Sequence, residues 1–149
     1  MRHELETAYW ALRPAIGATA FLAGLDKYFN LLANWTDYVS PLALEVLPFG
    51  ATTLMQVVGV VEIAVGLAIL LGWTRLGAYV ASAWLAAIAL NLVTTGRYFD
   101  IAVRDLVMAV AAYTLARLAE VRGTAEAAVP QHTRIFEGNS EHARDRLRA

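Results

Sequence analysis

The sequence predicts an all-α protein: a bundle of four transmembrane helices, with both termini cytoplasmic and an interfacial outer loop between the first two helices. Of its 149 residues, 58% are hydrophobic and only 17% are charged, whereas a soluble domain carries about 25% charged residues. Four apolar stretches, 14–32, 54–72, 76–93 and 101–119, are each close to the roughly 20 residues that cross a bilayer as a helix. The alternative is the buried core of a soluble four-helix protein, but 76–93 is apolar on all sides, which favours lipid.

The first stretch is expected to begin its helix at Pro14, because proline suits the first helical turn. It is interrupted by the charged pair Asp26 and Lys27. The loop that follows, 33–50, is long and partly apolar. We therefore expect it to form a short helix or cap at the membrane interface.

The later helices are joined by two short connections. Residues 73–75 predict a tight inner hairpin, and residues 94–98 predict an outer one in which Gly96 breaks the helix. Cytoplasmic loops of membrane proteins carry an excess of Lys and Arg. With both termini inside, the outer side carries only Lys27, Arg97 and Arg104, and the inner side carries Arg2, Arg13, Arg75, Arg117, Arg122 and four arginines of the tail.

The chain divides into a membrane domain, 1–122, and a polar tail, 123–149, which contains Gly, Pro, Ser and Asn. Within the membrane domain, small residues recur at helical spacing. They are Gly59 and Gly66, then Ala83 and Ala87, then Ala109 and Ala112. Such residues allow membrane helices to approach closely.

Each predicted helix also carries a strongly polar group in the half nearer the outer side. At a rise of about 1.5 Å per residue, these groups lie about 6–12 Å below the outer ends of the helices. A charge at this depth costs about 2.5–3.5 kcal/mol on insertion scales, so we expect these groups to face one another inside the bundle. The candidate ligand-binding residues are Asp26, Lys27, Glu62, Asn91, Arg104 and Asp105.

The spacing of these groups gives finer expectations. Glu62 shares a helical stripe with Gly59 and Gly66, and Asp100 lies four residues before Arg104, a favourable order for an ion pair. The charged members of the layer contain more acids than bases, so a fully ionised layer is disfavoured. We therefore expect Glu62, the deepest group, to be protonated or hydrogen-bonded to Asn91.

Composition excludes several function classes. The chain has no cysteine, which excludes disulfides, thiol relays and cysteine-bound iron–sulfur clusters within it. Its three histidines, His3, His132 and His142, all lie in the flanks, which excludes a haem held by two histidines between helices. The net charge is −1, so no basic surface argues for nucleic acid. A redox cofactor would therefore be diffusible or belong to a partner.

Two interpretations of the polar layer remain open. The layer either fixes the register and the partner choice of the helices, or it forms a pocket for a polar head group, such as a quinone ring or a small acid, open to the outer leaflet. Aromatic residues lie near the mouth of this pocket: Tyr28, Phe29, Trp35, Tyr98 and Phe99. We interpret them as anchors at the membrane interface, and Trp84 as lipid-facing or as a packing residue.

Several runs resemble the DoxX-like family of small four-helix membrane proteins. They are GLDKYFNLL at 24–32, NW at 34–35, SP at 40–41, GVVEIAVG at 59–66, NL at 91–92 and YFDIAVRDL at 98–106. The resemblance covers about residues 8–120, and its glycine–glutamate–glycine and arginine–aspartate motifs are moderately specific. It implies a multi-pass protein of the bacterial inner membrane, in a superfamily that includes the small subunit of an archaeal thiosulfate:quinone oxidoreductase.

The function that this resemblance implies is that of an integral membrane subunit of a redox system. Such a subunit anchors a redox partner or forms a homo-oligomer in lipid, binds quinone, and is at most an accessory subunit of a quinone-linked oxidoreductase. In that role Lys27 and Arg104 would bond the quinone oxygens, and Glu62 or Asp105 would relay protons. The alternatives are a protein that binds or transports a small solute or lipid, and a purely structural assembly subunit.

Overall fold

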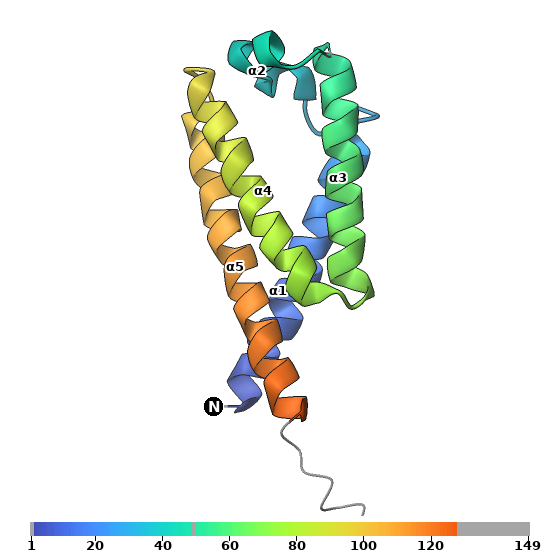
Figure 1. Cartoon of the computed structure of the whole chain (residues 1–149), viewed down its shortest axis with the longest axis vertical. Helices are drawn as coiled ribbons and strands as arrows, with labels where there is room; N and C mark the ends of the chain where they lie inside the picture. Colours follow the sequence, from blue (N-terminus) through green and yellow to red (C-terminus); the bar gives the residue numbers. More distant parts are fainter. Residues whose placement is uncertain (1, 49, 128–149) are drawn as a thin grey trace, which may run out of the picture.

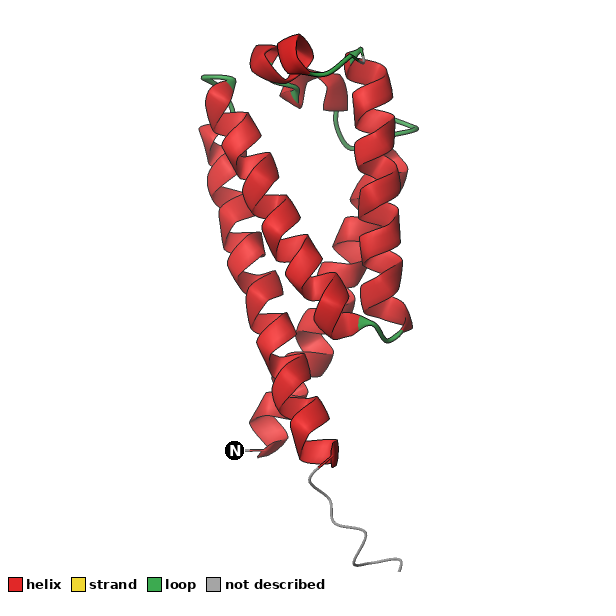
Figure 2. Ribbon diagram, viewed as in Figure 1, coloured by secondary structure: helices red, strands yellow, loops and turns green. Residues whose placement is uncertain are grey.

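The computed structural model describes residues 2–48 and 50–127. In order, the elements are α1 (Arg2–Asp26), η1 (Trp35–Tyr38, a 3₁₀ helix), α2 (Pro41–Val46), α3 (Ala51–Leu71), α4 (Thr74–Thr94) and α5 (Phe99–Ala127). The described residues contain five α-helices and no strand (Figure 2). The predicted all-α class is therefore confirmed.

The four long helices form two antiparallel pairs, α1 with α3 and α4 with α5 (Figure 1). The pairs meet near the α3–α4 turn, at what we call the narrow end, and they diverge toward the opposite, wide end (Figure 1). There η1 and α2 lie across the opening as a cap. The loop predicted at 33–50 thus does form short helices, as the sequence indicated.

Glycines bring the backbones of α1 and α3 into direct contact. A Cβ atom added at Gly59 would lie 2.7 Å from the carbonyl oxygen of Gly24, and one added at Gly66 would lie 2.7 Å from that of Gly17. The predicted role of Gly59 and Gly66 in close helix approach is confirmed. Their partners on α1 are two further glycines with the same seven-residue spacing, which the sequence interpretation did not pair with them.

The second pair, α4 with α5, packs through alanines. Ala109 and Ala112 are buried, as predicted. Ala83 and Ala87 are exposed, so their predicted packing role is wrong. The inward stripe of α4 lies to one side of them and comprises Gly77, Ala78, Ala81, Ala89 and Leu92.

All four long helices contribute to the larger core cluster, through residues such as Ile16, Ile69, Ala78 and Leu115. The smaller cluster joins Leu92 and other residues of α4 and α5 to the cap, through Tyr38 and Tyr98. Packing therefore holds the pairs together at the narrow end, whereas at the wide end the cap connects them.

The ends of α1 differ from the prediction. The helix begins at Arg2 and continues through Pro14, so Pro14 does not mark its first turn. It ends at Asp26, because the Asp26 carboxylate accepts hydrogen bonds from the backbone N–H groups of Leu31 and Leu32, at 2.9 and 3.0 Å. Asn30, which lies between Asp26 and Leu31, has a φ of 52°, outside the helical range. Lys27 consequently lies in a turn and not within the span.

The two predicted hairpins are present. Gly72, with a φ of 117°, ends α3, and Gly96, with a φ of 67°, lies in the connection from α4 to α5. A left-handed backbone at these points favours glycine. The last helix, α5, continues beyond 119 to Ala127, with hydrogen bonds from Thr124 Oγ1 to backbone carbonyl groups one turn earlier.

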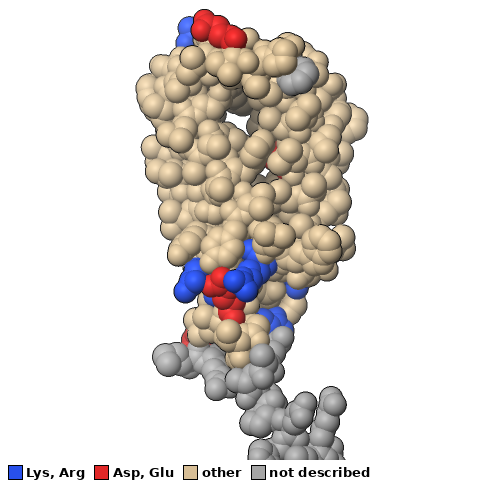
Figure 3. All heavy atoms as spheres, viewed as in Figure 1, with Lys and Arg blue, Asp and Glu red and all other residues tan. Residues whose placement is uncertain are grey.

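By length and composition, α3 and α4 are suited to cross a membrane. The charge-free parts of α1 and α5 are shorter, at 14–25 and 106–116. On the face shown in Figure 3, Lys, Arg, Asp and Glu gather at the two ends, and the surface between the ends is almost free of them. The same view shows the molecule hollowed between α3 and α4, below the cap.

Candidate functional site

A buried ion pair joins α1 to α3 near the wide end. Lys27 Nζ lies 2.5 Å from Glu62 Oε2, and the two side chains are 4% and 10% exposed. The glycine contact explains why they meet, because a Cβ atom at Gly59, one turn before Glu62, would lie only 3.2 Å from the Lys27 Cβ. The close approach of the two helices therefore fixes the position of this pair.

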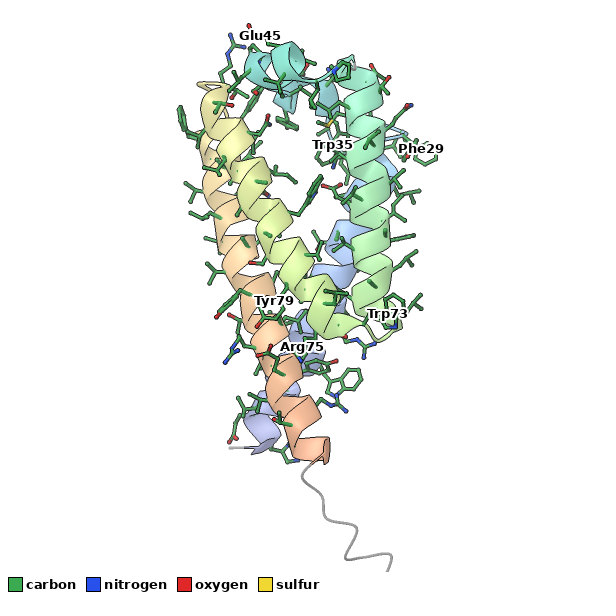
Figure 4. The ribbon with its side chains drawn as sticks, viewed as in Figure 1. Phe29, Trp35, Glu45, Trp73, Arg75 and Tyr79 are labelled. Carbon is green, nitrogen blue, oxygen red and sulfur yellow. The ribbon has the colours of Figure 1, made fainter. Side chains whose placement is uncertain are left out.

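Trp35 of η1 covers the ammonium group of this pair. The Lys27 Nζ lies 3.8 Å from the centre of the indole ring, a favourable cation–π distance. The indole Nε1 donates a hydrogen bond of 2.8 Å to Asp26 Oδ2. Figure 4 shows Trp35 on the inner side of the cap, beside α3. The Asp26 carboxylate, which also holds Leu31 and Leu32, is thus occupied as an anchor of the loop.

Asp105 approaches the ion pair from the other helix pair. It lies half-buried on α5. Its charge acts through space on those of Lys27 and Glu62, without forming an ion pair with Lys27 in the described part of the chain. The site thus holds one enclosed cation and two carboxylates, contributed by both helix pairs. Sequence reasoning placed all three residues in one layer, and the structure pairs two of them, Lys27 and Glu62, with Asp105 within electrostatic range.

Arg104 differs from the prediction that it lies among the enclosed polar groups, because its side chain is exposed. Its charge acts on the neighbouring Asp105. Asp100 is also exposed, and among the described residues no ion pair forms between it and Arg104. The reason is the direction of α5, whose inward stripe runs through Ala102, Asp105, Ala109, Ala112 and Ala116.

Asn91 holds the cap to α4. Its Nδ2 donates a hydrogen bond of 2.8 Å to the carbonyl oxygen of Tyr38, and its Oδ1 accepts one of 3.4 Å from the backbone N–H of Ser40. The expected hydrogen bond between Asn91 and Glu62 is wrong, because the helix pairs diverge toward the wide end and Glu62 binds Lys27 instead. The sequence could not show this, since the partner atoms of Asn91 are backbone atoms of the loop.

The aromatic residues expected near the mouth fall into two groups. Tyr28, Phe29 and Phe99 are exposed. Tyr38 lies edge-on to Tyr98, with ring centres 4.8 Å apart, and Trp35 lies edge-on to Tyr38 at 5.9 Å. This second group joins the cap to the α4–α5 connection at the wide end.

Trp84 is a candidate site residue that sequence reasoning did not include. It is half-buried on α4 between the buried Ala81 and Leu92, and its Nε1 is buried without a hydrogen-bond partner in the described part of the chain. Trp84 lies ten residues from the start of α4 and Glu62 lies nine from the end of α3. Both are thus about 14–15 Å above the same turn. The signal in the sequence was an indole donor within an otherwise apolar stretch.

The arrangement provides donors and acceptors for a small polar group between the helix pairs. Lys27 and the indole N–H of Trp84 can donate hydrogen bonds, and Glu62 and Asp105 can accept them or hold a proton. An unpaired buried donor is costly, which favours a partner for Trp84 Nε1 from outside the chain. Within residues 2–48 and 50–127, no group of three acidic or histidine side chains is arranged to hold a metal ion.

Comparisons with known protein families, with curated proteins and with solved structures give no match to this chain. The class that the fold defines is thus an all-α protein with two helices suited to cross a membrane. The resemblance to the DoxX-like family stays a prediction from the sequence.

Proposed function

We propose that this chain is a multi-pass protein of the bacterial inner membrane, of the DoxX-like type, that serves as the membrane subunit of a redox system and binds a quinone head group between its two helix pairs. In this proposal all four long helices span the bilayer and both termini are cytoplasmic. The narrow end is then the inner end and the cap faces outward. The protein is an accessory subunit that anchors a redox partner in lipid, and the oxidising or reducing centre belongs to that partner.

The membrane placement is supported by the surface of the long helices. Large apolar side chains are exposed along them. Examples that are 54% to 69% exposed are Leu22, Val60, Leu90, Val107 and Val110. A water-soluble protein rarely exposes so large an apolar surface, whereas the lipid chains of a bilayer would cover it.

The orientation is supported by the arginines. At the narrow end lie Arg13, Arg75, Arg117 and Arg122, whereas the wide end has Arg97 in the α4–α5 connection. An excess of Lys and Arg marks the cytoplasmic side. Arg104 is exposed near the start of α5, and its long side chain would extend toward the outer head groups.

The single observation that carries the ligand proposal is the enclosed pair of Lys27 and Glu62. Asp105 lies within electrostatic range of this pair. Trp84, whose Nε1 has no hydrogen-bond partner among the described residues, lies at the same height on α4. Glu62 and Asp105 lie within the proposed spans, and ionisable residues there most often mark ligand sites or proton paths. A quinone ring fits this set, because its two carbonyl oxygens require donors, and Lys27 and Trp84 are donors on opposite helix pairs.

A quinone, when bound, accepts two electrons and two protons. The chain's own residues would do the rest. Lys27 binds and orients one carbonyl oxygen, the Trp84 indole N–H binds the other, and the carboxylates of Glu62 and Asp105 hold protons next to the ring. Trp35 and the cap exclude water from the outer side. The exposed Arg104 has no part in this scheme, in contrast to the role that the sequence suggested.

A purely structural role for the ion pair is the second candidate, and one observation favours it. Lys27 and Glu62 lie directly beside the backbone contact of Gly24 and Gly59, so the pair also fixes the register of α1 on α3. In this case the layer would bind no ligand. Binding or transport of another small solute or lipid is the third candidate, and it uses the same donors and acceptors.

The test is extraction of the full chain from bacterial membranes in a mild neutral detergent, followed by mass spectrometry of the retained small molecules and proteins. We expect a retained quinone, and we expect its loss in Lys27→Met but not in Arg104→Gln, which removes an exposed charge near the same level. Retention of only lipid or another solute would favour a binding or transport protein. A stoichiometric partner with no small molecule would favour a structural subunit.

A further inference from the structure

A polar cavity that is open to the surface lies at the narrow end, far from the ion pair. It has a volume of about 270 Å³, and its lining includes Tyr9, Trp10, Arg13, Thr74, Arg75 and Arg122. We call it the arginine cavity. Of the residues that the structure describes, three arginines line it and no carboxylate does. Figure 3 shows the basic atoms gathered at this end of the molecule, around a few acidic atoms.

The three arginines are held in place by different contacts. Arg13 donates hydrogen bonds to the backbone carbonyl oxygens of Ile69 and Leu70, at 3.0 and 2.8 Å. Among the described residues no carboxylate pairs with it. Arg122 lies over the rings of Tyr9 and Trp10, 5.0 and 5.1 Å from their centres, and its Nη1 lies 3.7 Å from Glu6 Oε2.

Arg75 shares its acidic partner with another arginine. Its Nη2 lies 3.0 Å from Glu120 Oε1, while Arg117 pairs with the other oxygen of the same carboxylate. Only Arg75 of the two lines the cavity. One carboxylate thus faces two guanidinium groups, which leaves a positive potential beside the cavity.

A second, more apolar cavity of about 480 Å³ adjoins the first and shares Gly72 and Arg75 with it. Trp73, Leu76 and Tyr79 complete its lining. Figure 4 shows Trp73, Arg75 and Tyr79 together at this end of the helices. A charged cavity next to an apolar one suits a ligand that has an anionic group and a hydrocarbon chain.

We infer that the arginine cavity binds the phosphodiester of an anionic lipid, such as phosphatidylglycerol, with part of the lipid chain against Trp73, Leu76 and Tyr79. Basic pockets between membrane helices on the cytoplasmic side are suited to anionic head groups. A free phosphate ion would share the charge chemistry but would leave the apolar cavity unused. The inference rests on the membrane placement proposed above and is independent of quinone binding.

The test uses the full chain in phosphatidylcholine bilayers that contain a small fraction of brominated phosphatidylglycerol or brominated phosphatidylcholine. Bromine on the lipid chains quenches tryptophan fluorescence on contact, and Trp10 and Trp73 line the two cavities. We expect stronger quenching by the anionic lipid. In Arg75→Gln its preference over phosphatidylcholine should fall about fivefold, the contribution of one arginine at an anionic surface.

Arg117→Gln is the matched control, since it removes a second arginine from Glu120 without changing the cavity lining, and it should keep the preference. An equal fall in both variants would overturn the inference, because the preference would then reflect overall charge. Equal quenching by both lipids would also overturn it but would leave the membrane placement intact. Quenching by neither lipid would overturn both proposals. Displacement of the brominated anionic lipid by millimolar inorganic phosphate would assign the cavity to free phosphate.

Discussion

The contact between α1 and α3 can be tested by adding a single methyl group at Gly59. In Gly59→Ala, the new Cβ would lie 2.7 Å from the Gly24 carbonyl oxygen. Carbon–oxygen contacts between helices are normally no closer than about 3.3 Å, so the two backbones would have to separate by about 0.6 Å. Because the opposing atom is backbone, no side-chain rotation can relieve this clash.

Overpacking of this kind destabilises a protein by about 1–3 kcal/mol. Glu62 is one turn from Gly59, so the separation would also disturb its ion pair with Lys27, and we expect a loss in the upper part of this range. Gly123→Ala is the matched control. It adds the same methyl group to a helix at a point where no described atom outside its own helical turn lies within 4 Å, and it should be neutral or stabilising by up to about 1 kcal/mol.

The measurement is reversible unfolding of both variants in mixed detergent micelles, followed by circular dichroism and tryptophan fluorescence. The predicted order of stability is Gly123→Ala at or above the unsubstituted chain, and Gly59→Ala clearly below it. If Gly59→Ala is as stable as Gly123→Ala, α1 and α3 do not touch through their glycines, and the explanation of how Lys27 meets Glu62 fails.

Three further predictions concern the ion pair, the end of α3 and the topology. Lys27→Met should lower the free energy of unfolding by about 3–5 kcal/mol, because it leaves Glu62 buried without its partner. In the same unfolding experiment, Lys27→Met/Glu62→Gln should recover much of that loss. A double variant no more stable than Lys27→Met would argue against the pairing. Arg13→Gln should lower the stability by roughly 2–4 kcal/mol, since it weakens two charge-assisted hydrogen bonds. A thermal unfolding series would detect this loss. No change would mean that the last carbonyl groups of α3 do not need Arg13 as a hydrogen-bond donor. Since the chain has no cysteine, a membrane-impermeant maleimide added to intact spheroplasts should label Arg97→Cys but not Gly123→Cys, and the reverse result would invert the proposed orientation.

Much of the fold follows from local signals in the sequence. Gly72 and Gly96 mark the two tight connections because they adopt left-handed backbone conformations there. The spacing of Gly59, Glu62 and Gly66 places all three on one face of α3, and all three are buried. These features depend on residues that are close together in the chain, which is why the sequence alone predicts them.

Features that depend on distant partners could not be predicted. Asp26 ends α1 by binding backbone groups of the following turn, and Asn91 binds backbone atoms of the cap. The divergence of the two helix pairs decides that Asn91 meets the cap and that Glu62 meets Lys27. Arg104 and Asp105 are adjacent in sequence, yet only the packing of α5 shows that Asp105 faces inward.

The central claim is that the enclosed pair of Lys27 and Glu62 binds a ligand, and the most direct measurement is the affinity of the purified chain for a short-chain quinone analogue. Quenching of the fluorescence of Trp35 and Trp84 would report its binding. We predict saturable binding that weakens at least about tenfold in Lys27→Met, the equivalent of one lost hydrogen bond to a charged group, and that persists in Arg104→Gln. Binding that is absent from the unsubstituted chain, or equal in all three proteins, would contradict the claim and leave the ion pair with a structural role alone.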